Sequence, residues 1–153
     1  MYTTNPQQSE FSRIVSKDHA KRLHDLLVEV QTSNKGQIIF GGPEQCDIED
    51  KYIAPTLVRQ PSMDTRLMTE EIFGPILPVV SFDTTEEAIT MVNDDMSGTP
   101  LSMYVFTKSK KTCDTFVSKC PAGTMCRNDV LLQIAVRGLP FGGLGTRYVF
   151  LLM

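Results

Sequence analysis

The stretch "MTEEIFGPILPVVSF", residues 68–82, sets two adjacent carboxylates, Glu70 and Glu71, against an apolar run that a Gly-Pro pair interrupts. The run closes with "ILPVVSF", a short segment of β type. "DTTEEAITMVNDD" follows at 83–95, with a polar capping position ahead of apolar residues spaced as on one face of a helix. A strand that leads into a helix is therefore predicted here.

The residues before this stretch predict one helix and two strands. In "SKDHAKRLHDLLVEVQ", residues 16–31, Ser16 can cap the first turn and apolar residues recur at spacings of three and four. "GQIIFGG", residues 36–42, is predicted to be a short buried strand closed by a glycine turn. "KYIAPTLVRQ", residues 51–60, predicts a second strand, in which Pro55 implies a sheet edge or a bulge.

The residues after the stretch alternate between strand and helix. "PLSMYVFTKS" (100–109) predicts a strand, "KKTCDTFVSKCPAG" (110–123) a short helix, and "GTMCRNDVLLQIAV" (123–136) a strand with an extension. This order is typical of an α/β fold, in which helices cross between the strands of a partly parallel sheet. The chain has 153 residues, so we expect one compact domain or a piece of a larger one.

The composition narrows the classes of protein. A hydrophobic content of 41% and a charged content of 22% are those of a globular protein. A net charge of -3 without a basic stripe argues against nucleic acid as a partner. We also expect no membrane segment, because the apolar runs are far shorter than about 20 residues. Four cysteines without CxxC spacing predict reduced thiols in an intracellular, most simply cytoplasmic, compartment, with Cys113 and Cys120 as small buried side chains.

Two other kinds of chemistry have weaker support. "FGGLGTRY", residues 141–148, lacks the third glycine and the following helix of a dinucleotide-binding loop, so a tight turn is predicted. A thiol hydrolase would need a base beside its nucleophile, which here means Cys113 or Cys126 near His19 or His24. The sequence leaves that proximity open. We expect no metal site.

The two carboxylates allow two interpretations. Composition favours a solvated turn before a strand. The wording "EEIFGP" also offers a carboxylate that can accept hydrogen bonds from two vicinal sugar hydroxyls, with the aromatic ring of Phe73 close by and a rigid bend beside both. An aromatic ring in that place can pack on a flat heterocycle. The second interpretation predicts a nucleotide-type ligand at Glu70 or Glu71.

Three segments together resemble one known family. These are "KYIAPTLVRQPSMDTRLMTEEIFGPILPVVSFDTTEEAITMVND" at 51–94, "AGTMCRND" at 122–129 and "LPFGGLG" at 139–145. In this order and approximate spacing they resemble the C-terminal part of the aldehyde dehydrogenase superfamily, over residues 10–145. The "ND" and "LPFGG" wording is most similar to the branch that includes the class 3 and fatty aldehyde dehydrogenases.

The resemblance implies a cofactor, a substrate and four site residues. It implies that Glu71 binds the hydroxyls of the nicotinamide ribose of NAD or NADP, and that Phe73 contacts the nicotinamide. It implies further that Phe141 lines the aldehyde pocket and that Asn128 lies in the strand leading to it. The family reaction is attack of a thiolate on the aldehyde, hydride transfer to NAD(P) and hydrolysis of the thioester.

The chain departs from the family where the reaction would take place. The family's nucleophile lies in a "GQxC"-like context and its base glutamate in an "ELGGK"-like one, and neither wording occurs here. We therefore assign no catalytic residue and expect a fragment, about the last third of a family subunit, that is inactive alone. An alternative is a non-catalytic module that pairs with a full-length subunit in a homo- or hetero-oligomer.

The resemblance also suggests how the chain is divided. We expect a polar lead-in at 1–10, a partial aldehyde dehydrogenase catalytic domain at 11–145 and an atypical apolar tail at 146–153. Strands that pack on absent elements should leave apolar surface exposed and favour aggregation.

Overall fold

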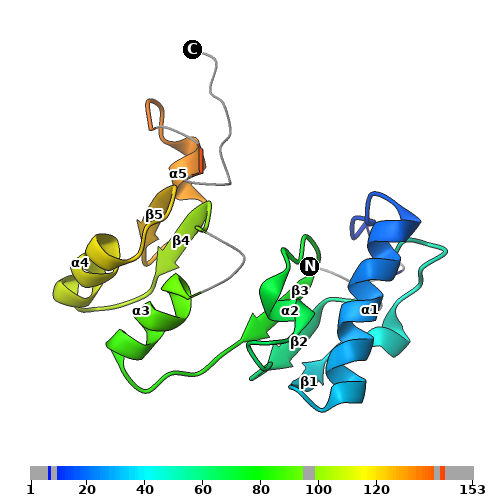
Figure 1. The fold of residues 1–153 in the computed structure, drawn as a ribbon. Coiled ribbons are helices and arrows are strands. Elements are labelled where there is room, and N and C mark those ends of the chain that lie inside the picture. The colour runs from blue at the N-terminus through cyan, green and yellow to red at the C-terminus, as the bar shows by residue number, and fades with distance from the viewer. Residues whose placement is uncertain (1–6, 8–9, 95–98, 140–141, 144–153) are drawn as a thin grey trace. The chain divides into compact units, whose positions relative to one another are not determined.

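The structure, a computed structural model, describes residue 7 and residues 10–94, 99–139 and 142–143 (Figure 1). Contacts within the chain divide it into two compact units, Met1–Ser81 and Phe82–Met153. The predicted tail at 146–153 lies outside the described residues.

The first unit combines helices with a three-stranded sheet. Its elements are α1 (Lys17–Ser33), β1 (Gln37–Phe40), the 3-10 helix η2 (Pro43–Gln45), β2 (Thr56–Arg59), α2 (Arg66–Thr69) and β3 (Ile76–Val79). The strand order is β1-β2-β3, with β1 antiparallel and β3 parallel to β2. The short helix α2, which the sequence pattern did not predict, lies in the connection between the two parallel strands. An α/β fold with a partly parallel sheet is thereby confirmed.

Two predictions about the sheet are wrong. Strand β1 is not buried: three of its four residues are exposed, because it forms an edge of the sheet. Pro55 marks neither an edge nor a bulge, since it precedes the central strand of this sheet. The ladder begins one residue later, where the backbone N–H of Thr56 donates to the carbonyl of Pro75 at 2.9 Å. Proline's missing donor therefore costs no ladder bond.

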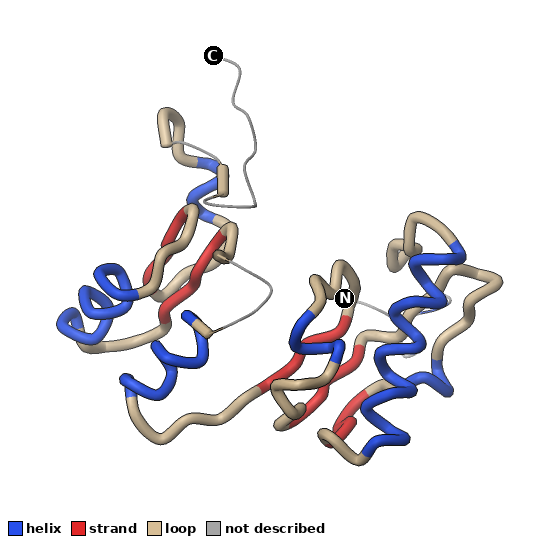
Figure 2. Tube along the Cα trace, in the orientation of Figure 1, coloured by secondary structure: helices blue, strands red, loops and turns tan. Residues whose placement is uncertain are grey.

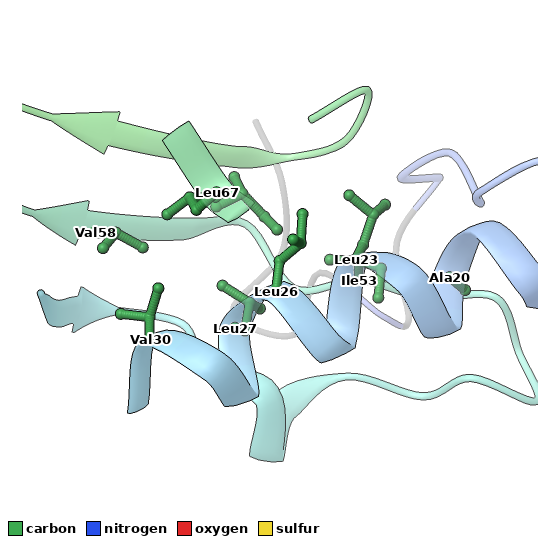
Figure 3. Packing of buried hydrophobic residues seen from close by; sticks show 9 residues of the cluster. Ala20, Leu23, Leu26, Leu27, Val30, Ile53, Val58 and Leu67 are labelled. Carbon is green, nitrogen blue, oxygen red and sulfur yellow. The ribbon is translucent and has the colours of Figure 1, made fainter. Parts of the chain in front are cut away.

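Helix α1 supplies most of the core of the first unit. Its start is capped as predicted: the Ser16 hydroxyl accepts a hydrogen bond from the backbone N–H of His19 at 3.2 Å. Asn34 ends it in the left-handed conformation. Figure 3 shows the buried side chains of α1 beside those of β2, α2 and the loop before β2. The core consists of Ala20, Leu23, Leu26, Leu27, Val30, Ile53, Val58, Leu67 and Ile76.

The second unit repeats the alternation of helix and strand (Figure 2). It contains α3 (Thr85–Asn93), β4 (Ser102–Val105), α4 (Lys110–Lys119), β5 (Thr124–Arg127) and α5 (Leu132–Ala135). Strands β4 and β5 are parallel and α4 connects them, which is the predicted crossover. Cys113 and Cys120 are buried at 7% and 2% exposure, as expected. Among the described residues, no helix has the length and apolarity needed to cross a membrane.

In the segment after β5, the polar residue Gln133 is buried. The predicted extension of the strand is the short helix α5, in which Gln133 is buried while its apolar neighbours are exposed. The Gln133 Nε2 donates to the Tyr104 hydroxyl at 2.7 Å. The exposed apolar side chains are those of Val130, Leu131, Leu132, Ile134, Val136 and Leu139. This surface, 130–139, is the largest run of exposed apolar residues in the described sequence.

Candidate functional site

The candidate site is the turn between α2 and β3, residues 70–75. Helix α2 ends where the backbone N–H of Glu70 donates to the carbonyl of Arg66 at 2.9 Å. The side chain of Ile72 packs against the core cluster, and strand β3 begins at Ile76. The turn is thus fixed at a helix end on one side and a strand start on the other.

The first carboxylate, Glu70, is held by two arginines. Its Oε1 accepts from Arg66 Nε at 2.7 Å, and its Oε2 lies 3.6 Å from Arg22 Nη1 on α1. The hydrogen bond from Arg66, with the positive charges of both arginines, lowers the pKa of Glu70. The same hydrogen bond raises the pKa of Arg66. Glu70 therefore has two arginine partners within the protein.

Arg22 also binds the backbone of the turn. Its Nη2 donates to the carbonyl of Ile72 at 2.6 Å and its Nη1 to the carbonyl of Glu71 at 3.3 Å. Sequence analysis missed this residue, because its partners lie 49 and 50 positions further along the chain and no local pattern marks them.

Phe73 and Gly74 give the turn its shape. Phe73 has a φ of 51°, in the left-handed region, and is 83% exposed. A residue other than glycine pays about 1–3 kcal/mol for such a strained conformation, so the surrounding contacts must hold it. Gly74 lies directly against α1, since a Cβ atom there would come within 2.5 Å of Leu23 Cδ1. The glycine lets the backbone approach the helix, and the adjacent aromatic ring is turned outward.

Glu71 and Phe73 line one pocket of about 640 Å³. The other lining residues are Arg13, Ile14, Val15, His19 and Arg22. The structure thus brings together the two residues that the resemblance assigned to the cofactor. The Arg13 guanidinium is engaged elsewhere: it donates to Asp50 Oδ2 at 2.9 Å and to the carbonyl of Phe11 at 2.7 Å.

This arrangement suits a ligand that has both hydroxyls and a flat ring. An exposed carboxylate can accept two hydrogen bonds, and an exposed aromatic face can cover a heterocycle. Among the described residues that line the pocket, none is a cysteine or a serine.

Asn128 has a structural task in the second unit. It follows the end of β5 with a φ of 55°, and its side chain binds both backbone groups of Thr107: Oδ1 accepts from the N–H at 2.7 Å and Nδ2 donates to the carbonyl at 3.0 Å. It thus extends the pairing of β4 and β5 beyond their last residues. Its part in an aldehyde pocket stays a prediction. Phe141 lies outside the described residues.

The cysteines are all free thiols. Cys46 and His24 line a second pocket of about 370 Å³. Burial raises the pKa of the Cys46 thiol, and its Sγ lies 3.4 Å from both the carbonyl of Gly42 and the N–H of Ala54. Such a thiol stays protonated and serves packing. The pairing of Cys113 or Cys126 with a histidine stays a prediction.

The fold and site together define an α/β protein whose first unit has a pocket between α1, the segment before it and the 70–75 turn. Comparison with known families makes this specific: the model of the "Aldehyde dehydrogenase family" matches residues 3–146. The chain belongs to the aldehyde dehydrogenase family.

Individual relatives agree with this assignment. Aldehyde dehydrogenase family 3 member H1 of Arabidopsis thaliana is 39% identical over 145 residues, which are 94% of this chain and 29% of that protein. A structure titled as the substrate-bound state of Staphylococcus aureus AldH is 36% identical with a TM-score of 0.83, and covers 96% of this chain and 31% of its own. An indole-3-acetaldehyde dehydrogenase solved with NAD+ is 26% identical with a TM-score of 0.70, over 89% and 28% of the two chains.

These comparisons confirm the resemblance drawn from the motifs, including its class 3 branch. They also measure its extent: the chain spans about 30% of the length of the relatives that it matches.

Proposed function

We propose that this chain forms part of the catalytic unit of an NAD(P)-dependent aldehyde dehydrogenase and supplies its contact with the nicotinamide ribose. The observation that carries the proposal is that Glu71 and Phe73, assigned from the family motif, line the same pocket. Membership of the family and a relative solved with NAD+ support NAD or NADP as the cofactor.

The residues of the turn have distinct tasks in this proposal. Glu71 accepts hydrogen bonds from the two ribose hydroxyls, and the ring of Phe73 covers one face of the nicotinamide. Bound NAD or NADP supplies the hydride acceptor for oxidation of an aldehyde to a carboxylic acid. Orientation is the contribution of this chain, because a misplaced ring lowers the rate of transfer steeply.

We propose that the chain alone does not turn over an aldehyde. A nucleophilic cysteine needs a lowered pKa and access to solvent. Burial raises the pKa of Cys46 and of Cys120, and Cys113 is 7% exposed. Cys126 is half-buried and lacks the family's "GQxC" context.

Two measurements on the 153-residue chain test these statements. In an NMR titration, NAD+ is expected to shift the backbone signals of Glu71 and Phe73, and Glu71→Gln is expected to remove the shifts. Glu86→Gln, which changes an exposed glutamate on α3, is the matched control. Signals at the turn that NAD+ leaves unmoved would contradict the cofactor contact. An aldehyde-dependent rate of NAD(P)H formation well above that of the Glu71→Gln variant would contradict the lack of turnover.

A second candidate function is pairing with a longer subunit of the family. The exposed apolar side chains of the first unit's sheet favour it, with Leu77 at 57% and Val79 at 43% exposure on β3. Co-purification with a full-length aldehyde dehydrogenase is the expected result. A monodisperse monomer in the presence of such a subunit would argue against it.

The likeness to family 3 supports a substrate class, and the thiols support a compartment. We propose an aldehyde of the fatty class, since the sequence most resembles that branch and the Arabidopsis thaliana relative belongs to family 3. Reduced thiols suit an intracellular, cytoplasmic location.

A further inference from the structure

Arg22 connects helix α1 to three consecutive residues of the turn. Its Nη2 binds the carbonyl of Ile72 at 2.6 Å, its Nη1 binds that of Glu71 at 3.3 Å, and the same nitrogen lies 3.6 Å from the Glu70 carboxylate. The guanidinium is a rigid, planar fork, so these bonds fix direction as well as distance. Its side chain is 27% exposed, which limits competition from water.

The next residue of the helix holds the other end of the turn. Leu23 lies so close to Gly74 that a Cβ there would come within 2.5 Å of its Cδ1. Adjacent residues of α1 therefore fix the turn on both sides of Phe73. With the carbonyls of Glu71 and Ile72 bound, the peptide groups on both sides of Ile72 cannot rotate freely.

We propose that Arg22 is a positioning residue of the cofactor site: by binding the carbonyls of Glu71 and Ile72, it holds Glu71 and Phe73 in the places where they line the pocket. The inference rests on the proposed function. It also gives the two adjacent carboxylates separate tasks. Glu70 pairs with Arg22 and Arg66, whereas Glu71 lines the pocket.

The test compares three variants of the whole 153-residue chain. Arg22→Gln removes the fork and the charge. Arg22→Lys keeps the charge beside Glu70, but its single ammonium cannot reproduce the fork across two carbonyls. Arg66→Gln is the matched control, since it removes the other arginine at Glu70 and leaves both carbonyl bonds in place.

The first readout is the NMR order parameter of the backbone at residues 71–73. We expect it to fall in Arg22→Gln from about 0.85, a rigid value, to below about 0.6, a flexible one. Arg22→Lys should give an intermediate value and Arg66→Gln one close to that of the unmodified chain. The amides of Leu23 and Leu26 should keep their values in every variant, which separates local positioning from general loss of structure.

The second readout is the affinity for NAD+, followed by the shifts at residues 71 and 73. Arg22→Gln should weaken it roughly tenfold, on the scale of one charged hydrogen bond lost through misplacement of Glu71. Arg66→Gln should leave it within about twofold. If Arg22→Gln does not fold, the order parameters and the affinity for NAD+ are compared between Arg22→Lys and the unmodified chain instead.

The two ideas fail in different ways. Order parameters in Arg22→Gln and Arg22→Lys that equal those of the unmodified chain would overturn the inference, whatever NAD+ does. If NAD+ does not shift the NMR signals of residues 71 and 73 in the unmodified chain, the proposed cofactor contact is overturned. The proposed role of Arg22 in positioning that contact then falls with it.

Discussion

At the scale of single residues, Glu70 and Glu71 show how neighbours of one type acquire different surroundings. The sequence left open whether this pair forms a solvated turn or serves a ligand, and the family motif pointed to Glu71 as the ligand's carboxylate. The pairing of Glu70 with Arg22 could not be read from sequence, since it joins α1 to a turn 48 residues away. Local patterns report neighbours along a helix or strand, and this contact exists only after α1 has packed on the sheet.

The lowered pKa of Glu70 predicts a pH dependence of stability. Its ordinary value is 4.5 and the folded value is lower, so its contribution is present above about pH 4.5 and is lost as pH falls through the folded pKa. The side chain is 38% exposed, and screening therefore limits the contribution to less than about 1 kcal/mol. Urea unfolding of the chain and of Glu70→Gln, at pH 7 down to about pH 3, should show a difference that closes on acidification.

Arg66→Gln is the control for this prediction. It removes the main cause of the shift and should shrink the same difference. A gap between the Glu70→Gln variant and the unmodified chain that widens below pH 4 would mean that the carboxylate is stabilised in its protonated form.

At the scale of elements, sequence patterns predicted most helices and strands but did not predict which of them are buried. The period of α1 and its cap at Ser16 were sufficient to place that helix. "GQIIFGG" looks equally apolar whether it forms a central or an edge strand, so the exposure of β1 required the pairing order. Helix α2 has only four residues, too few for a period to appear.

A matched pair of leucines tests the core of the first unit. Leu26 on α1 is fully buried and Leu77 on β3 is 57% exposed. Leu26→Ala should lower the free energy of unfolding by about 2–5 kcal/mol, because it removes buried methyl groups and leaves a cavity. Leu77→Ala should change it by no more than about 0.5 kcal/mol. Equal losses in urea unfolding would mean that the outer face of β3 is covered in solution.

Comparing Gly41 with Gly138 separates the cost of backbone strain from the cost of a steric clash with a new Cβ atom. Both have positive φ, 75° at Gly41 and 85° at Gly138. A Cβ at Gly41 would come within 2.3 Å of the carbonyl oxygen of Pro55, whereas none of the described atoms lies within 4 Å of one at Gly138. Gly41→Ala should therefore cost about 1–3 kcal/mol more than Gly138→Ala.

Thermal unfolding of both variants measures this difference. Similar melting temperatures would show that the turn after β1 can move away from Pro55.

At the scale of the whole molecule, the chain spans about 30% of the length of the relatives that it matches, and part of its surface is apolar. The surface 130–139 presents apolar side chains while Gln133 is buried. We expect a dye that binds hydrophobic surface to fluoresce with the folded chain. The double variant Ile134→Gln and Val136→Gln should reduce the signal, and Val117→Gln, at a single exposed position on α4, should reduce it less.

An unchanged signal in the double variant would place the dye elsewhere on the chain. The class of fold and the family were predictable because long motifs and alternating elements are visible in the sequence itself. The inward glutamine was not, because an apolar run interrupted by one polar residue normally turns that residue outward.

The outward ring of Phe73 makes this position a place to attach a reporter. The side chain is 83% exposed while its neighbours rest on α1, so Phe73→Cys would carry a fluorophore at the pocket without entering the core. Raised pKa values keep the native thiols of Cys46 and Cys120 slow to react, and Cys113 is buried. Labelling at neutral pH would therefore favour the new thiol over these three, and its emission would report, in real time, changes in the surroundings of the 70–75 turn.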